Sequence, residues 1–238
     1  MTDFKSSLSP KDIAAAARRY ARDSRVRIAD FLAPETAREL HDFLAGGEWW
    51  RTFNQGERTW DLGPESLAAL TPEQAAQLDS AIHQGARTGF QYVYETIRVS
   101  EDSSERASRA LAVDRLLDML NDEAMLEVWR KLTGDQQVGF VDGQATRYLP
   151  GHFLTRHDDD VAGKNRVAAY VLNLCPEWQP EFGGLLQFHD AEGEVTSAMV
   201  PGFNVLNLFR VPQPHSVSVV APFAPAPRYA ITGWVRRG

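Results

Sequence analysis

The hydrophobic pattern divides the chain into two halves of different character. In the first half, apolar residues recur at helical spacing, as in PETARELHDFLA (34–45), which ends at the common helix stop Gly46-Gly47. Ser9-Pro10-Lys11-Asp12 has the form of a capping box with proline at the first helical position. Residues 26–32 alternate like a short strand. Helices are predicted after Ser9 and over 34–45, 72–97, 106–120 and 122–133.

After about residue 136 the pattern changes to short runs rich in Val, Leu, Phe and Tyr, separated by Gly, Pro, Asp and Asn. Such runs, bounded by turn residues as in Asp190-Ala191-Glu192-Gly193, predict β-strands. Strands without intervening helices favour an antiparallel sandwich or barrel over a parallel α/β sheet. About seven strands are predicted, over 137–149, 166–174, 184–190, 194–200, 204–210, 215–221 and 228–236.

No internal repeat, low-complexity tract or linker separates the two halves. We therefore expect one domain over 1–238, in which a mainly helical region (1–135) supports a β-rich core (136–238). With 238 residues, the chain is long enough to bury such a core without disulfides or metal ions as staples.

Composition narrows the functional classes. A formal net charge of -7 argues against a protein that binds nucleic acid directly, because neutralising phosphates requires clustered Lys and Arg. The charge is compatible with a basic protein or peptide partner. Cys175 is the only cysteine, so no intrachain disulfide can form. With no signal-peptide core and no apolar run approaching the roughly 20 residues of a membrane span, we expect a cytoplasmic protein that does not enter a membrane.

A candidate metal site begins in the stretch R-H-D-D-D (156–160). Residues two apart in an extended segment point to the same side, so His157 and Asp159 can converge on one ion while Asp158 points away. His215, at the start of a later β-rich run, is the candidate third ligand. Two imidazoles and one carboxylate form the facial triad of non-haem Fe(II) sites. Zinc also uses these ligands, so the ligand set alone does not choose the metal.

A second candidate group lies in R-Y-A-I-T-G-W-V (228–235), where alternation places Arg228, Ala230, Thr232 and Trp234 on one face. On the inner face of a barrel, Arg228 would be a buried cation that needs an anionic partner, and a guanidinium suits a carboxylate. There it would be within reach of a dicarboxylic cosubstrate that chelates iron. The alternative is an outward-facing arginine on an edge strand.

These motifs, in this order, resemble those of the 2-oxoglutarate/Fe(II)-dependent dioxygenases, specifically their prolyl-hydroxylase branch. The resemblance covers roughly 140–236. The motif R-Y-A-I-T-G-W (228–234) is similar to a strand of the hypoxia-type prolyl hydroxylases. In contrast, H-D-D, P-E-W and Gly183-Gly184 more closely resemble prolyl hydroxylases that act on a ribosomal protein. The motifs are R-Y-L-P-G (147–151), H-D-D (157–159), L-N-L-C-P-E-W (172–178), F-G-G-L-L (182–186), P-H-S-V (214–217) and R-Y-A-I-T-G-W (228–234).

The resemblance implies a fold that is mostly β with added α: a double-stranded β-helix, or jelly-roll core, with helices packed against one sheet. It implies His157, Asp159 and His215 as iron ligands and Arg228 as the residue that binds the distal carboxylate of 2-oxoglutarate. It also implies cosubstrate-pocket positions for Tyr148, Thr232 and Trp234. Where the relatives carry a further pocket tyrosine, this chain has Asn173, whose amide can still donate to the cosubstrate but over a shorter reach.

The implied reaction is hydroxylation of an unactivated C–H bond with Fe(II), 2-oxoglutarate and O2, with ascorbate as a supporting reductant and with succinate and CO2 as products. Related halogenases lack the carboxylate ligand, so the presence of Asp159 predicts hydroxylation. The first hypothesis for the substrate is a prolyl residue in a protein, with ribosomal and translation proteins as candidates. The alternatives are a hydroxylase of a free amino acid or small metabolite, and a metal-dependent binding or sensor module without turnover.

Two segments are candidates for substrate recognition. One is E-W-W-R-T-F (48–53), where Trp49 and Trp50 are adjacent; the alternative is that one tryptophan packs in the core and the other is merely exposed. The other is the loop D-V-A-G-K-N-R (160–166), just beyond the first two ligands. Loops beside a barrel mouth commonly carry specificity, which favours the second segment.

Overall fold

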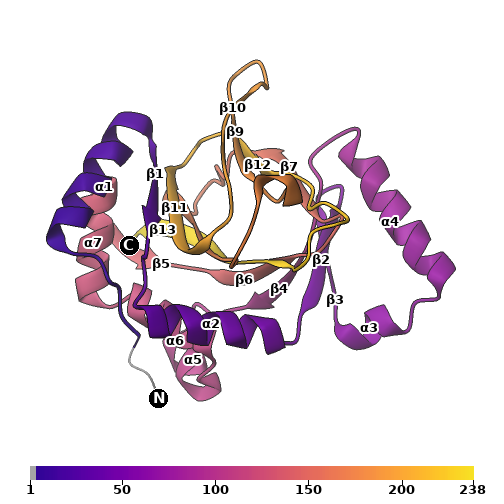
Figure 1. The fold of residues 1–238 in the computed structure, drawn as a ribbon, viewed down its shortest axis with the longest axis horizontal. Coiled ribbons are helices and arrows are strands. Elements are labelled where there is room, and N and C mark those ends of the chain that lie inside the picture. The colour runs from indigo at the N-terminus through magenta and orange to yellow at the C-terminus, as the bar shows by residue number, and fades with distance from the viewer. Residues whose placement is uncertain (1–3) are drawn as a thin grey trace.

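A computed structural model describes residues 4–238. Within this range, thirteen strands form one curled sheet in which all neighbours pair antiparallel, and seven α-helices pack along its sides and below it in the view of Figure 1. The helices are α1 (Pro10–Asp23), α2 (Pro34–Gly46), α3 (Pro64–Ala68), α4 (Pro72–Ala86), α5 (Ser103–Arg109), α6 (Ala112–Leu120) and α7 (Glu123–Thr133). The strands are β1 (Arg25–Ala29), β2 (Trp50–Gln55), β3 (Arg58–Leu62), β4 (Tyr92–Arg98), β5 (Val138–Val141), β6 (Gln144–Tyr148), β7 (Phe153–His157), β8 (Arg166–Leu174), β9 (Leu186–His189), β10 (Val195–Met199), β11 (Phe203–Arg210), β12 (His215–Val217) and β13 (Arg228–Arg237).

Most of the predicted helices are confirmed, and local chemistry explains their ends. At α1 the Ser9 side chain accepts a hydrogen bond from the Asp12 amide while the Asp12 carboxylate accepts from the Ser9 amide, which is the predicted capping box. Helix α2 begins at a proline and ends at Gly46, as its pattern predicted. The helix predicted over 106–120 is two helices, because Ala110 adopts a left-handed conformation between them. No helix in the described part of the chain is long and apolar enough to cross a bilayer.

The prediction of a helix over 72–97 is wrong beyond Ala86. Residues 92–98 (YVYETIR) form β4, whose aromatic and β-branched side chains fit a pleated surface better than a helix. The hairpin β2–β3, which pairs Trp50–Gln55 with Arg58–Leu62, also lies in the half predicted to be mainly helical. All four strands of this half join the same sheet as the later strands, and on this basis we propose one domain over 1–238.

The sheet is curled so that its two parts face each other. One part has the strand order β1-β11-β8-β13-β6-β4, the other has β7-β12-β9-β10, and β4 pairs with β7 where they meet. The predicted jelly-roll core with helices against one sheet agrees with this arrangement. Helices α1, α2, α6 and α7 lie along the outside of the larger part, and α4 lies at the opposite end of the molecule (Figure 1).

Strands β8 and β13 are buried on both faces, which explains why β8 shows no alternation of polar residues. The side chains on the outer face belong to the main core between helices and sheet, as Tyr170 and Ile231 do. Those on the inner face, such as Val171 and Ala230, pack between the two parts of the sheet. The inner face is where the candidate site residues of β13 are found.

His152 gives the folded chain a pH dependence that is separate from the candidate site. Burial lowers the pKa of His152 to about 3, with further lowering by the nearby Arg51 and Arg147 guanidinium groups. The unfolded chain binds this proton near pH 6.5, so the contribution to stability is fully present above pH 6.5 and is lost as the pH falls toward 3. We expect the free energy of unfolding to fall by up to about 1.4 kcal/mol per pH unit from this one group.

Urea unfolding of the metal-free protein between pH 7 and pH 5 measures this dependence. The variant His152→Gln should show a shallower pH dependence than the wild type, while His83→Gln, at an exposed histidine, should not. Equal slopes in His152→Gln and the wild type would contradict the assignment.

Candidate active site

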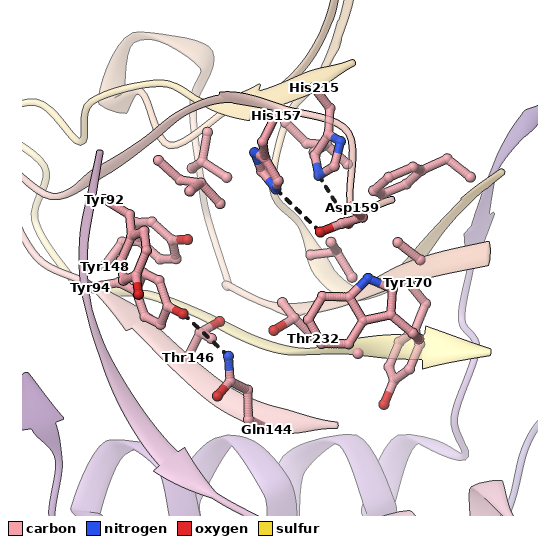
Figure 2. Close-up of a pocket in the computed structure, with 18 of the residues that line it drawn as sticks. Tyr92, Tyr94, Gln144, Thr146, Tyr148, His157, Asp159, Tyr170, His215 and Thr232 are labelled. Carbon is pink, nitrogen blue, oxygen red and sulfur yellow. Dashed lines mark hydrogen bonds and ion pairs between the residues drawn. The ribbon is translucent and has the colours of Figure 1, made fainter. Parts of the chain in front are cut away.

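Two histidines face each other across neighbouring strands. His157 is the last residue of β7, His215 is the first residue of β12, and the register pairs them directly, with ring centroids 4.1 Å apart. The Asp159 carboxylate completes the group: Oδ1 lies 3.5 Å from Nε2 of His157, and Oδ2 lies 3.4 Å from Nε2 of His215 (Figure 2). The three ligand atoms lie within 4.8 Å of one another. No other such group of His, Cys, Asp or Glu occurs within residues 4–238.

The convergence predicted from the sequence is confirmed, but strand parity does not produce it. Strand β7 ends at His157, and Asp159 has a φ of 65°, in the left-handed region. The backbone therefore turns after β7 and brings the Asp159 carboxylate back toward both imidazoles. Asp158 and Asp160 are exposed, and the Asp160 amide donates to the Asp158 carboxylate at 3.0 Å. These two aspartates face solvent rather than the histidines.

Both imidazoles are held in the tautomer that a metal ligand requires. Nδ1 of His157 lies 3.0 Å from the carbonyl oxygen of Thr155, and Nδ1 of His215 lies 2.8 Å from that of Gln213. Because a carbonyl only accepts, each Nδ1 carries the proton and donates it. Each Nε2 then presents its lone pair to the point that Asp159 also faces. Such carbonyl contacts commonly orient metal-binding histidines.

Protonation states at neutral pH also suit a cation. Burial raises the pKa of Asp159, but the facing His157 and His215 outweigh this effect, and the pKa lies below its ordinary value. Burial and the neighbouring His157 lower the pKa of His215 to about 4. At pH 7 the site therefore combines an ionised carboxylate with a neutral imidazole on β12, and both groups are in the state in which they bind metals.

A cavity of about 470 Å³ opens beside the three ligands and extends between the two parts of the sheet. One wall is a row of tyrosines, Tyr92, Tyr94 and Tyr148, whose neighbouring ring centroids are 5.4 Å apart (Figure 2). The side-chain amide of Gln144 donates to the Tyr94 hydroxyl at 3.4 Å. Phe90 is 49% exposed, also lines the cavity, and lies 5.5 Å from the His157 ring, centroid to centroid.

Arg228 lines the same cavity as a buried cation. It is 1% exposed, its Nε has no hydrogen-bond partner, and Nη2 donates to the Asn173 amide oxygen at 3.4 Å. The guanidinium carbon lies 5.0 Å from the centroid of the Tyr148 ring. No carboxylate of the described residues forms an ion pair with Arg228. A buried guanidinium is costly without an anion, so this end of the cavity is suited to an anionic ligand.

Comparisons with known proteins agree with this site. Residues 143–236, which include all three metal ligands and Arg228, match the family model described as "2OG-Fe(II) oxygenase superfamily". The part of the chain that carries the metal ligands and Arg228 therefore resembles the 2OG-Fe(II) oxygenase superfamily. Together, the superfamily and the triad imply Fe(II) and 2-oxoglutarate as cofactors, with O2 as the oxidant. Ascorbate as a supporting reductant stays a prediction.

The proteins to which the chain is similar include prolyl hydroxylases. The chain is 28% identical to prolyl 3-hydroxylase OGFOD1 of Mus musculus over 142 residues, which are 57% of this chain and 25% of that protein. The chain thus matches only a quarter of the length of this relative.

Solved structures show the shared fold. A Pseudomonas putida prolyl-4-hydroxylase matches with a TM-score of 0.59 at 21% identity, covering 95% of this chain and 99% of that one. A Trichoplax adhaerens prolyl hydroxylase in complex with a hypoxia inducible factor oxygen degradation domain peptide fragment matches with a TM-score of 0.61 at 17% identity, covering 97% and 94%.

Strand β13 directs three of the residues predicted from strand alternation into the cavity. Arg228, Thr232 and Trp234 line the cavity, Ala230 packs beside it, and Tyr148 from β6 lies opposite Arg228 in the β6–β13 register. The alternative of an outward-facing Arg228 on an edge strand does not hold, because β13 pairs with both β6 and β8.

Asn173 lies next to Arg228 at the end of the cavity. It is fully buried in β8 and does not line the cavity; its amide nitrogen lies 3.3 Å from the carbonyl oxygens of Val171 and Val205. Its contact to the cavity runs through Arg228, whereas Val171, two residues earlier in β8, lines the open space.

The tightly packed Gly183-Gly184 explains part of the F-G-G-L-L motif. Both glycines have positive φ values, 70° and 62°. A Cβ on Gly184 would lie 2.7 Å from Cδ of Arg228, and one on Gly183 would lie 2.0 Å from the carbonyl oxygen of Val219. Any side chain at Gly184 would therefore displace the Arg228 side chain from its position at the cavity wall.

Of the two segments predicted to recognise the substrate, only the loop 160–166 contributes residues to the cavity wall. Trp49 is 3% exposed and its indole donates to the Leu44 carbonyl, whereas Trp50 is 48% exposed and does not line the cavity. Val161 and Arg166, from the loop 160–166, do line it. Sequence reasoning missed Tyr92 and Tyr94, because it placed them in a helix. Their alternation in YVYETIR was the signal that would have found them.

Proposed function

We propose that this oxygenase hydroxylates an unactivated C–H bond of a prolyl residue in a protein, with ribosomal and translation proteins as first candidates. The observation that carries the chemistry is a complete His-Asp-His triad beside a cavity whose other end holds a buried, unpaired arginine. The similarity to a mouse prolyl 3-hydroxylase supports prolyl as the target.

The chain's own residues would divide the work as follows. His157, Asp159 and His215 would hold the metal, which together with 2-oxoglutarate and O2 supplies the oxidant that converts C–H to C–OH and releases succinate and CO2. Arg228 would bind the distal carboxylate of 2-oxoglutarate through its paired N–H groups. Asn173 would act through Arg228, because its amide oxygen accepts from the guanidinium and keeps it oriented.

The surrounding side chains would orient the cosubstrate and shield it from water. Burial raises the pKa of Tyr148, so its hydroxyl keeps its proton and can donate to a carboxylate. The hydroxyl of Thr232 lines the same cavity, and the Trp234 ring forms a wall next to the metal ligands. The half-exposed Phe90 lies at the rim beside His157, where an incoming target residue would pass.

Two other functions remain in competition with this proposal. A hydroxylase of a free amino acid or small metabolite would use the same triad and the same arginine. A binding or sensor module would keep the fold without turnover; the intact triad and the unpaired Arg228 argue against it. The three functions differ in which compound, if any, stimulates the conversion of 2-oxoglutarate to succinate.

Mass spectrometry of ribosomal and translation proteins tests the prolyl target. We expect a gain of one oxygen atom on a prolyl peptide in cells that express the wild-type chain, and none in cells that express Asp159→Ala, which lacks one metal ligand. Unmodified prolines in both cell lines would contradict a target among these proteins.

Purified protein then separates the competing functions. With Fe(II) and 2-oxoglutarate, the modified segment supplied as a synthetic peptide should stimulate succinate formation, whereas the same peptide with proline replaced by alanine should not. Stimulation by free amino acids alone would favour the metabolite hydroxylase. Absence of any iron-dependent succinate would favour the binding module.

A further inference from the structure

Arg166 lies beside the metal ligand Asp159, although it is not itself a ligand. Its Nη1 donates to the backbone carbonyl of Asp159 at 3.0 Å and lies 3.9 Å from the Asp159 Oδ1. The guanidinium carbon is 3.5 Å from the centroid of the Trp234 ring, so the planar group is stacked on the wall of the cavity. We propose that Arg166 is a positioning residue that holds Asp159 in its ligating conformation and thereby sets the affinity of the site for its metal.

The backbone at Asp159 needs such support. Its φ of 65° is a conformation that residues with a side chain seldom adopt, and it is this turn that directs the carboxylate at both histidines. The hydrogen bond from Arg166 holds the peptide carbonyl at this turn, and the stack on Trp234 fixes the guanidinium that donates it.

Arg166 is in turn anchored by β13. Within the loop 160–166, the Lys164 carbonyl accepts from Nε of Arg236 at 3.0 Å, and the Asn165 carbonyl accepts from the Arg237 amide at 3.0 Å. The loop therefore returns to the sheet at a fixed place, and Arg166 opens β8 in register with Arg236. Through Arg166, strand β13 therefore supports Asp159, which is the one metal ligand that lies outside a strand.

The position of Arg166 is otherwise unfavourable. Two arginines stand directly opposite each other, Arg166 on β8 and Arg236 on β13, and like charges in this relation destabilise a sheet. Asp142 offsets part of this repulsion by accepting from Arg236 at 3.1 Å. Nε of Arg166 is also buried without a partner. Sheet stability does not account for an arginine at this position, whereas the hydrogen bond that holds Asp159 does.

Charge and geometry predict opposite effects of removing Arg166. By charge alone, a cation 3.9 Å from a ligand oxygen repels a metal cation, so its removal would tighten metal binding. If Arg166 instead acts by holding the Asp159 backbone, its removal lets the carboxylate leave its ligating position and weakens metal binding. Residues that orient metal ligands typically change metal affinity by 10- to 100-fold when removed.

Titration of the metal-free full-length protein with Mn(II), followed by the electron paramagnetic resonance signal of free Mn(II), tests this inference. Arg166→Ala should bind about one Mn(II) with affinity at least roughly tenfold weaker than the wild type. Arg166→Lys keeps the charge but cannot stack flat on Trp234 and donate in the same geometry, so it should also bind more weakly. No substrate or 2-oxoglutarate is present, so the result does not depend on the proposed prolyl target.

Arg156→Ala is the matched control, because it removes the same charge from an exposed arginine next to the ligand His157. Its Mn(II) affinity should stay within about twofold of the wild type. Unaltered circular dichroism and a stoichiometry near one would separate weaker binding from partial unfolding. If Arg166→Ala fails to fold, Arg166→Lys decides. Mn(II) binding as tight as in the wild type, or tighter, in the folded Arg166 variant would overturn the inference.

Discussion

Replacing Asp159 with alanine is expected to reduce 2-oxoglutarate-dependent hydroxylation by more than about 100-fold. The reason is that Asp159 supplies the only carboxylate in the group formed with His157 and His215, and even residues that merely orient metal ligands cost 10- to 100-fold in metal affinity or activity when removed. Succinate formation from 2-oxoglutarate under saturating Fe(II) measures the loss.

Asp159→Gly separates ligation from backbone strain. Glycine adopts the φ of 65° freely, whereas alanine is strained there, so the glycine variant should fold at least as well as the alanine variant and be equally inactive. The charge controls are Asp158→Ala and Asp160→Ala, at exposed residues that face away from the site. Both should lose far less activity. Full activity in Asp159→Ala, or equal losses in all three alanine variants, would overturn the ligand assignment.

Removing the Arg228 side chain is expected mainly to raise the 2-oxoglutarate requirement. Truncating one partner of a buried, hydrogen-bonded charge pair costs about 2–5 kcal/mol, which corresponds to an increase of about 30-fold or more in KM for 2-oxoglutarate. At saturating 2-oxoglutarate, kcat should change much less, because Arg228 does not contact the metal ligands. Initial rates of succinate formation across 2-oxoglutarate concentrations separate the two constants.

Two variants show whether Arg228 binds an anion or only supports the fold. Arg228→Met keeps most of the volume but removes a buried charge that has no protein counter-ion, so thermal stability without 2-oxoglutarate should be equal or higher. The rise in Tm that 2-oxoglutarate gives the metal-loaded wild type should be largely lost in this variant. Arg228→Lys keeps the charge without the fork and should lie between the two. An unchanged KM in Arg228→Met would remove the proposed role.

Much of the site could be predicted because alternation within a single strand fixes which of its side chains share a face, and this can be read from a few consecutive residues. Alternation placed Arg228, Thr232 and Trp234 on one face of a strand, and the structure puts all three in the cavity. The distal ligand His215 was identified by residue type and by its place in a β-rich run. Its direct pairing with His157 depends on the register between two strands, which local pattern does not specify.

The errors arose where one local signal competed with another. The helical spacing of α4 was extended to residue 97, although the aromatic and β-branched residues of β4 favour a strand, so the tyrosine wall of the cavity was missed. The left-handed turn at Asp159 has no glycine to mark it, and parity gave the right partner for the wrong reason. For Asn173, a direct contact with the cosubstrate stays a prediction; the structure shows its amide oxygen accepting from Arg228, and Asn173 itself does not line the cavity.

The unpaired charge of Arg228 has a consequence for how turnover would respond to the cell's metabolism. Oxidative decarboxylation alters only the end of 2-oxoglutarate near the metal, so succinate keeps the carboxylate that Arg228 would hold. Product and cosubstrate would then compete for the same buried cation, because both carry the carboxylate that Arg228 would hold. If Arg228 binds this carboxylate as proposed, succinate would inhibit turnover, and the rate would follow the ratio of 2-oxoglutarate to succinate rather than the 2-oxoglutarate concentration alone.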